Sequence, residues 1–245
     1  MQLSLMAVMG LVSQANQVLG QCPNTILDLS PWYLQLPIGS PGHPTTVSTS
    51  QLMECYHNRY FQGASDNSVV FRVPGSPNTS GCVTTANSKH CRTELHESRI
   101  WQPTSSVNRL TADLRVVNPG GSTAIGQVHI DDRVSSKPAI EMYYENNGNI
   151  TVGVERNRSG GGQVRTTLGR VPVGTRFGYE IRWERGTIQV GINGNMRVLS
   201  QNDLHNPPVY FKAGNYLQGS SPSEVRFYSL HVAHTSGRGG DPVDL

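Results

Sequence analysis

The sequence alternates between short runs of β-branched and aromatic residues and tight clusters of glycine, proline, asparagine and serine. Runs of this composition favour the pleated, half-buried surface of a strand, and 26 glycines and 15 prolines spread over 245 residues supply the turns between them. Many short strands must each bury one face, which two packed sheets achieve. We therefore predict an all-β sandwich of two antiparallel sheets. The clearest strands are residues 68–73, 109–117, 123–130, 139–144, 150–155, 176–184, 187–192, 209–213 and 224–233.

Turn signals and one helical signal lie between these runs. Asn147-Gly148-Asn149 and Asn193-Gly194-Asn195 each place glycine beside asparagine, a pattern typical of tight hairpin turns. We predict a loop tip at residues 159–162 and a single short helix near residues 50–56. There is no internal repeat and no long linker, so one domain of ordinary size is expected.

The ends of the chain differ in composition from the middle. The first twenty residues contain no charged side chain and carry an apolar run over residues 3–12, with Val18, Leu19 and Gly20 at the end. This pattern predicts a signal peptide at residues 1–20, and no segment is apolar for long enough to span a bilayer. Residues 21–235 form the expected folded domain. The polar, glycine-rich residues 236–245 predict a flexible tail.

Four cysteines remain in the expected mature chain, at positions 22, 55, 82 and 91. An even number behind a signal peptide predicts two disulfides and an extracellular protein. Three pairings are open, of which we favour Cys82–Cys91 across a short loop, leaving Cys22–Cys55. Three N-glycosylation triplets begin at Asn78, Asn149 and Asn157. We expect glycans there if the protein is eukaryotic.

Charge and potential metal ligands exclude several classes of function. The formal net charge is +3 and the basic residues are scattered, whereas nucleic-acid binders concentrate theirs. His231 and His234 are three apart and would point to opposite faces of a strand, and no calcium-loop pattern surrounds Asp131-Asp132. We therefore predict no metal and no cofactor, no nucleic-acid or membrane partner, and a monomer.

Three segments place polar side chains of related chemistry on one face of a strand. Residues two apart share a face, and the polar faces consist of Arg92, Glu94 and His96; of Gln127 and His129; and of Tyr210, Lys212, Tyr216 and Gln218. An antiparallel strand with one hydrated face would explain any one of them. Together they offer groups that bind an anion and transfer protons.

The same segments resemble the three signature motifs of polysaccharide lyase family 7, the alginate lyases. They read Arg92-Thr93-Glu94-Leu95-His96, Gln127-Val128-His129 and Tyr210-Phe211-Lys212-Ala213-Gly214-Asn215-Tyr216-Leu217-Gln218, and they occur in the family's order. Residues 27–37 are similar to the family's opening strand, so the resemblance spans residues 26–234. It implies a β-jelly-roll sandwich with a concave groove for an acidic polysaccharide, alginate. In one departure, His96 stands where the family usually has a second arginine.

The resemblance also implies roles for the polar residues. The catalytic residues would be Arg92, Gln127, His129 and Tyr216, and the substrate-binding residues would be Glu94, His96, Lys212, Tyr210 and Gln218. Arg92 and Gln127 would neutralise the uronate carboxylate, and Tyr216 would protonate the leaving oxygen. The base would be His129 for guluronate and Tyr216 for mannuronate. The Q-V-H form of the second motif accompanies a preference for mannuronate-rich polymer.

Two other functions fit the same pattern. A non-catalytic, lectin-like sandwich could keep the groove, although binding alone would not require Arg92, Gln127, His129 and Tyr216 together. A lyase for another polyuronate, such as glucuronan, would share the elimination chemistry. The sequence does not separate these from alginate cleavage.

Overall fold

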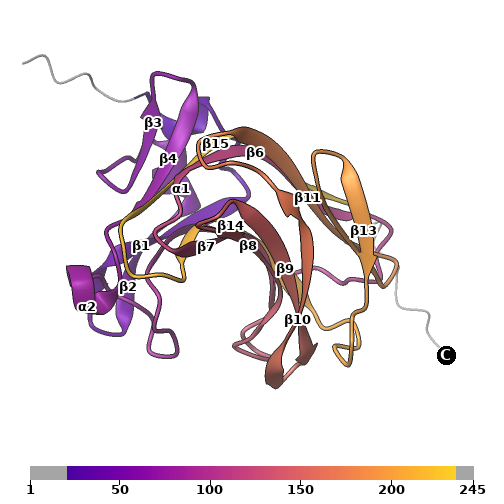
Figure 1. Ribbon diagram of the computed structural model, residues 1–245. Coiled ribbons are helices and arrows are strands. Elements are labelled where there is room, and N and C mark those ends of the chain that lie inside the picture. The colour runs from indigo at the N-terminus through magenta and orange to yellow at the C-terminus, as the bar shows by residue number, and fades with distance from the viewer. Residues whose placement is uncertain (1–20, 236–245) are drawn as a thin grey trace, which may run out of the picture.

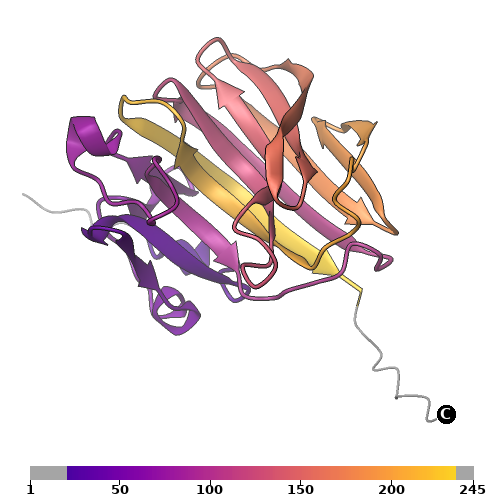
Figure 2. The same ribbon diagram turned by 90° about the horizontal axis from the view of Figure 1, so that it is seen from below.

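The computed structural model describes residues 21–235, and the strands of this part of the chain form two curved antiparallel sheets packed face to face (Figure 1). The inner, concave sheet contains, in spatial order, β10 (Gly160–Arg170), β9 (Asn149–Asn157), β8 (Pro138–Glu145), β7 (Ser122–Ile130), β14 (Val209–Leu217), β5 (Arg92–Glu97), β1 (Trp32–Ser40) and β2 (His43–Val47). The outer sheet contains β13 (Asn195–Leu199), β12 (Thr187–Ile192), β11 (Arg176–Glu184), β6 (Asn108–Asn118), β15 (Ser223–His234), β4 (Ser68–Val73) and β3 (Phe61–Ala64). Figure 2 looks from below at the strands lying side by side. The predicted all-β jelly-roll sandwich is confirmed.

All nine strands predicted from the run pattern are present, most with their ends shifted by one or two residues. Four strands were not predicted: β2, β3, β10 and β13. These four are the edge strands of the two sheets. An edge strand has one neighbour and faces solvent, so it lacks the buried, alternating apolar pattern on which the prediction relied.

The two sheets differ in how their strands are buried. In β6 and β11 of the outer sheet, buried and half-exposed residues alternate, as expected when one face is hydrated. In β5 of the inner sheet every residue is buried, although all of its side chains except that of Leu95 are polar or charged. The inner sheet therefore carries buried polar side chains on its concave face as well as buried apolar side chains on the face that meets the core.

The core lies between the sheets and is built from large side chains. Trp32, Trp183, Phe71, Phe211 and Phe227 have no measurable exposure, and burying side chains of this size is the main favourable term in folding. Trp101 is also buried and packs on Phe211 with 4.6 Å between ring centroids. No helix among residues 21–235 is long and apolar enough to cross a membrane.

The helices are short, and both predicted disulfides are confirmed. Cys22 pairs with Cys55, and Cys82 pairs with Cys91. The first bond ties the 3-10 helix η1 (Pro23–Thr25) to the chain after α1 (Thr49–Met53), which is the predicted helix shortened at its C-terminal end. It ends early because Cys55 adopts a positive φ of 68°. A further helical turn, α2 (Pro77–Ser80), was not predicted.

Both predicted hairpins are present, but the predicted loop tip is partly wrong. Gly148 and Gly194 have φ values of 81° and occupy the turns that join β8 to β9 and β12 to β13. Residues 160–162 belong to β10 rather than to a loop, because three glycines with positive φ continue the strand through a bulge. The expected signal peptide, residues 1–20, and the expected tail, residues 236–245, lie outside the described residues.

Candidate active site

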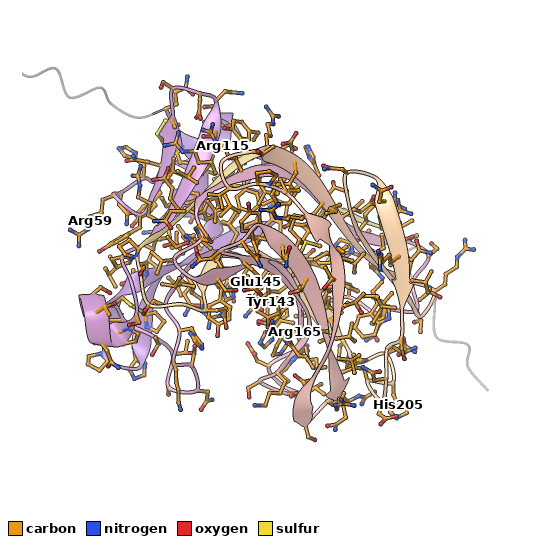
Figure 3. All side chains as sticks on the ribbon, in the orientation of Figure 1. Arg59, Arg115, Tyr143, Glu145, Arg165 and His205 are labelled. Carbon is orange, nitrogen blue, oxygen red and sulfur yellow. A yellow bond between two sulfur atoms is a disulfide. The ribbon has the colours of Figure 1, made fainter. Side chains whose placement is uncertain are left out.

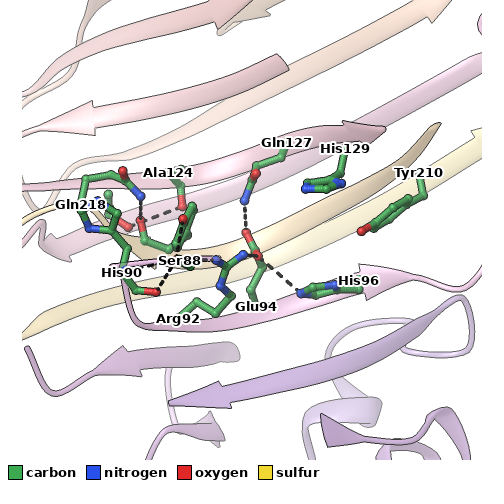
Figure 4. A network of polar contacts seen from close by, with 12 residues as sticks. Ser88, His90, Arg92, Glu94, His96, Ala124, Gln127, His129, Tyr210 and Gln218 are labelled. Carbon is green, nitrogen blue, oxygen red and sulfur yellow. Dashed lines mark hydrogen bonds and ion pairs between the residues drawn. The ribbon is translucent and has the colours of Figure 1, made fainter. Parts of the chain in front are cut away.

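The three polar segments of the sequence lie on adjacent strands, because β14 is between β5 and β7. In the paired register Lys212 is opposite Gln127 on one side and His96 on the other, and Tyr216 is opposite Arg92. Residues that are far apart in sequence are therefore neighbours on the concave face. Figure 4 shows Arg92, Glu94 and His96 of β5 on one side and Gln127 and His129 of β7 on the other, with Gln127 turned toward Glu94.

Glu94 is the centre of this cluster and is 1% exposed. Its carboxylate accepts hydrogen bonds from Arg92 Nη1, at 3.3 Å, and from the amide nitrogen of Gln127, and His96 Nε2 lies 3.5 Å away (Figure 4). Burial opposes ionisation, but the contact with His96 and the charges of Arg92 and Lys212 outweigh it and lower the pKa of Glu94 to about 2. Glu94 is therefore an anion that holds the two neighbouring side chains in place.

His129 is arranged as a neutral imidazole. Its Nδ1 lies 2.7 Å from the carbonyl oxygen of Ile130, which can only accept, so Nδ1 is the donor. Burial and the positive charge of Lys212 lower the pKa of His129 well below its usual 6.5. With the proton on Nδ1, the other ring nitrogen, Nε2, has a free lone pair near neutral pH.

Tyr216 lies beneath the guanidinium of Arg92, whose Cζ is 3.7 Å from the centre of the phenol ring. Its hydroxyl is 3.1 Å from the hydroxyl of Ser88. Gln218 does not line the cleft. Its amide nitrogen donates to the backbone carbonyl of Tyr216 at 3.2 Å, so it contacts the strand that carries the phenol.

Lys212 is a buried cation at 4% exposure. Burial, only partly offset by the carboxylate of Glu94, lowers its pKa to about 8. Lys212 is therefore mostly charged at neutral pH and loses that charge in mildly alkaline solution.

One end of the site is aromatic. Tyr33 Oη lies 3.1 Å from His96 Nδ1, and the ring of Tyr210 stacks 6.3 Å from that of His96. Burial and the charge of Lys212 lower the pKa of His96 to about 4, whereas burial raises the pKa of Tyr33 to about 12. Near neutral pH the His96 imidazole and the Tyr33 phenol are therefore uncharged hydrogen-bonding groups.

These side chains line one cleft of about 340 Å³ on the concave face. It brings together all four residues expected to be catalytic: Arg92, Gln127, His129 and Tyr216. Of those expected to bind substrate, His96, Lys212 and Tyr210 also line it, while Glu94 lies behind Arg92 and Gln127.

Sequence reasoning missed several other side chains of the cleft, including Tyr33, Ser88 and Asp132. Tyr33 was visible only as part of the opening strand, and Ser88 belongs to a loop without a motif. From the sequence, Asp132 was considered only as a possible calcium ligand; its side chain is 70% exposed and accepts a hydrogen bond from Tyr210 Oη at 3.3 Å. No group of three or more His, Cys, Asp or Glu side chains placed to hold a metal ion occurs within residues 21–235.

The fold and the cleft place the protein in the class of jelly-roll sandwiches with a polar groove on the inner sheet. The sequence model of a family described as alginate lyase matches residues 27–234. The chain therefore belongs to the alginate lyases of polysaccharide lyase family 7. A search of curated protein sequences finds no match.

Solved structures of this family superpose on nearly the whole domain. An alginate lyase from Pseudomonas aeruginosa is 32% identical, with a TM-score of 0.74, and the match covers 85% of this chain and 100% of that chain. A variant of the family 7 alginate lyase A1-II′ in complex with a product is 28% identical, with a TM-score of 0.76 and 87% and 99% coverage. Another variant of A1-II′, in complex with a substrate, is 26% identical, with a TM-score of 0.76 and 89% and 99% coverage.

Proposed function

We propose that the protein is a secreted lyase that cleaves mannuronate-rich alginate by β-elimination and leaves 4,5-unsaturated uronate ends. The observation that carries this proposal is the convergence of Arg92, Gln127, His129 and Tyr216 on one cleft. Binding a sugar acid requires a cation and hydrogen-bond donors. The addition of a neutral imidazole and a phenol at the same place supplies proton transfer as well.

The first step of the reaction requires removal of the C5 proton beside a carboxylate. The carbanion that develops there is stabilised only if the carboxylate charge is spread onto preorganised donors. Arg92 offers a fork of N–H groups, and Gln127 has a second amide hydrogen besides the one directed at Glu94. Because Glu94 fixes both side chains before substrate arrives, little reorganisation is needed during the reaction.

The second step breaks the C4–O4 bond. The electron pair left by the C5 proton forms the C4=C5 double bond, and the departing O4 takes the phenolic proton of Tyr216. For guluronate the proton and the leaving group are on opposite faces of the ring, and His129 accepts the proton on Nε2. For mannuronate they are on the same face, and Tyr216 serves as base and then as acid.

The other polar residues contribute to binding and support. Lys212 supplies positive charge to the polyanion, and His96 and Tyr210 contact a neighbouring sugar at the aromatic end of the cleft. Gln218 acts through the backbone of Tyr216.

The concave face continues beyond the cleft across β8 and β10, where the guanidinium of Arg165 lies 4.0 Å from the centre of the Tyr143 ring (Figure 3). Arg115, by contrast, lies on the outer sheet. An extended polymer therefore meets further polar side chains beyond the cleft.

Activity is tested by incubating the protein with mannuronate blocks, guluronate blocks and glucuronan and following the absorbance of the unsaturated product. We expect the fastest rise with mannuronate blocks. Tyr216→Phe should reduce turnover by about 10²–10⁴-fold with the fold intact. Wild-type turnover in that variant would reject the mechanism, and binding without any product would favour the lectin-like alternative.

The proposal of secretion rests on the two disulfides and on the composition of residues 1–20. We propose that residues 1–20 are removed, that residues 21–235 act as a monomer, and that a eukaryotic host adds glycans at Asn78, Asn149 and Asn157. Asn78 is exposed, whereas the other two are half-buried, so we expect Asn78 to be modified most fully. Mass spectrometry of the exported protein gives the mature N-terminus and the glycan at each site.

A further inference from the structure

A loop closed by the Cys82–Cys91 disulfide forms one wall of the cleft. It is fastened to the inner sheet at both ends. The amide of Val83 donates to the carbonyl of Pro37 in β1 at 3.0 Å, and the carbonyl of Cys91 accepts from the amide of Leu217 in β14 at 3.0 Å. A loop held by a covalent bond and by two strands presents its side chains to the cleft with little freedom.

Ser88 is the residue of this loop that reaches the reacting groups. Its Oγ lies 3.1 Å from Tyr216 Oη and 3.2 Å from Arg92 Nη2. It is also 3.1 Å from both the backbone nitrogen and the backbone carbonyl oxygen of His90. One hydroxyl thus has four polar neighbours, two of which, the N–H groups of Arg92 and His90, can only donate.

The hydrogen-bonding capacity of a hydroxyl decides how these four contacts are shared. A serine oxygen has two lone pairs and one hydrogen. The N–H groups of Arg92 and His90 occupy both lone pairs. The single hydrogen then has two acceptors to choose between, the carbonyl oxygen of His90 and the phenolic oxygen of Tyr216.

We propose that Ser88 is a positioning residue that sets the direction of the Tyr216 hydroxyl and donates a hydrogen bond to its oxygen when the phenol has lost its proton. While Tyr216 is a phenol, the Ser88 hydrogen points to the carbonyl of His90, and the phenolic hydrogen is free to face the leaving oxygen of the sugar. Whenever Tyr216 is a phenolate, before it accepts the C5 proton of mannuronate or after it protonates the leaving oxygen of guluronate, the Ser88 hydroxyl rotates toward it. This inference rests on the proposed role of Tyr216 as the proton donor.

Two substitutions of equal shape isolate the hydroxyl. Ser88→Thr keeps it and Ser88→Val replaces it with a methyl group. A hydrogen bond to a charged oxygen corresponds to a loss of about 10- to 100-fold in kcat for Ser88→Val. KM for guluronate blocks should stay within about twofold, since with that polymer the interaction is made only after the proton has moved. Ser88→Thr should retain most of the wild-type kcat, and Ser88→Ala serves as a smaller variant if valine prevents folding.

Ser80→Ala is the matched control, made like the other variants in a bacterial host because it also removes the glycosylation triplet that begins at Asn78. Its hydroxyl is also hydrogen-bonded beside the same disulfide, where it donates to the carbonyl of Ser76 at 2.9 Å and accepts from the amide of Cys82, but Ser80 does not line the cleft. We expect wild-type kcat for this variant. Equal kcat for Ser88→Thr and Ser88→Val would overturn the proposal, as would an equal loss in Ser80→Ala.

A binding measurement separates an effect through Tyr216 from one through Arg92. In the Tyr216→Phe background, calorimetry gives the Kd of a mannuronate oligosaccharide without turnover. Adding Ser88→Val should leave that Kd within about twofold, and a tenfold or greater weakening would mean that Ser88 acts by holding Arg92. If Tyr216→Phe keeps wild-type turnover, the proposed mechanism itself fails. If it is inactive while Ser88→Val is fully active, only the role of Ser88 is rejected.

Discussion

Replacing Glu94 with glutamine removes one negative charge from the centre of the site with almost no change of shape. The carboxylate is buried among Arg92, Gln127 and His96. Its pKa is lowered from an ordinary value of 4.5 to about 2. At about 1.36 kcal/mol per pH unit, the ionised form stabilises the folded state by about 3 kcal/mol. Breaking a buried ion pair by removing one partner has a cost of the same order.

The pH dependence of this loss follows from the direction of the shift. A carboxyl whose pKa is depressed on folding adds stability above its unfolded value, and that stability disappears as the pH falls from about 4.5 to about 2. Urea unfolding at pH 7 should therefore show Glu94→Gln to be less stable by about 3 kcal/mol. The difference should shrink as the series is repeated at pH 5, 4 and 3.

Activity should change together with stability. Glutamine offers one acceptor oxygen where the carboxylate offers two, so either the Arg92 fork or the Gln127 amide loses its acceptor, and we expect kcat/KM to fall by about 10- to 100-fold. Glu94→Gln should also move the alkaline decline of activity to lower pH, because the carboxylate supports the charge on Lys212. Glu54→Gln, at an exposed site, is the control. Equal stability of Glu94→Gln and wild type at pH 7, or a difference that does not vary with pH, would refute this account.

Three further predictions concern the base, the buried lysine and the loop. His129→Ala should lose activity on guluronate blocks by about 10²–10⁴-fold and keep activity on mannuronate blocks; parallel loss on both, in the absorbance assay, would mean one base for both sugars. Because the pKa of Lys212 is about 8, affinity for alginate should fall as the pH rises through 8, and Lys212→Arg should remove that decline; an unchanged pH profile of KM would contradict it. Replacing Cys82 and Cys91 with serine, which opens a loop of sequence separation 9, should lower the free energy of unfolding by about 2–3 kcal/mol and also reduce kcat. Unchanged urea midpoint and kcat would show that the loop needs no covalent closure.

Internal strands were predictable from the sequence and edge strands were not. Strands such as β6 and β11 alternate apolar and polar residues because one face meets the core and the other meets water. The edge strands β2, β3, β10 and β13 pair on one side only. Many of their side chains face solvent and are polar, so the apolar alternation of an internal strand is missing. The sequence of Gly160–Arg170, for example, is that of a loop followed by a polar stretch.

The candidate site was predictable only where it follows a motif on a strand. Alternation along β5, β7 and β14 indicated most of the polar side chains that line the cleft, although Gln218 contacts the backbone of Tyr216 instead. It gave no sign of Ser88, which approaches Tyr216 from a loop 128 positions away. Nor could it indicate that burial makes His96 and His129 neutral, since desolvation depends on what covers a side chain.

Local chemistry in the chain was enough to determine a two-sheet β-sandwich, two disulfides and three polar strand faces, because strand propensity, turn residues and the two-residue side-chain period act between near neighbours. Tertiary structure alone decided that β14 lies between β5 and β7, and so that Arg92, Gln127 and Tyr216 share one cleft. Strand order depends on how all the strands together bury their apolar faces, and no single segment carries that information. Burial then determined which of the assembled groups are charged.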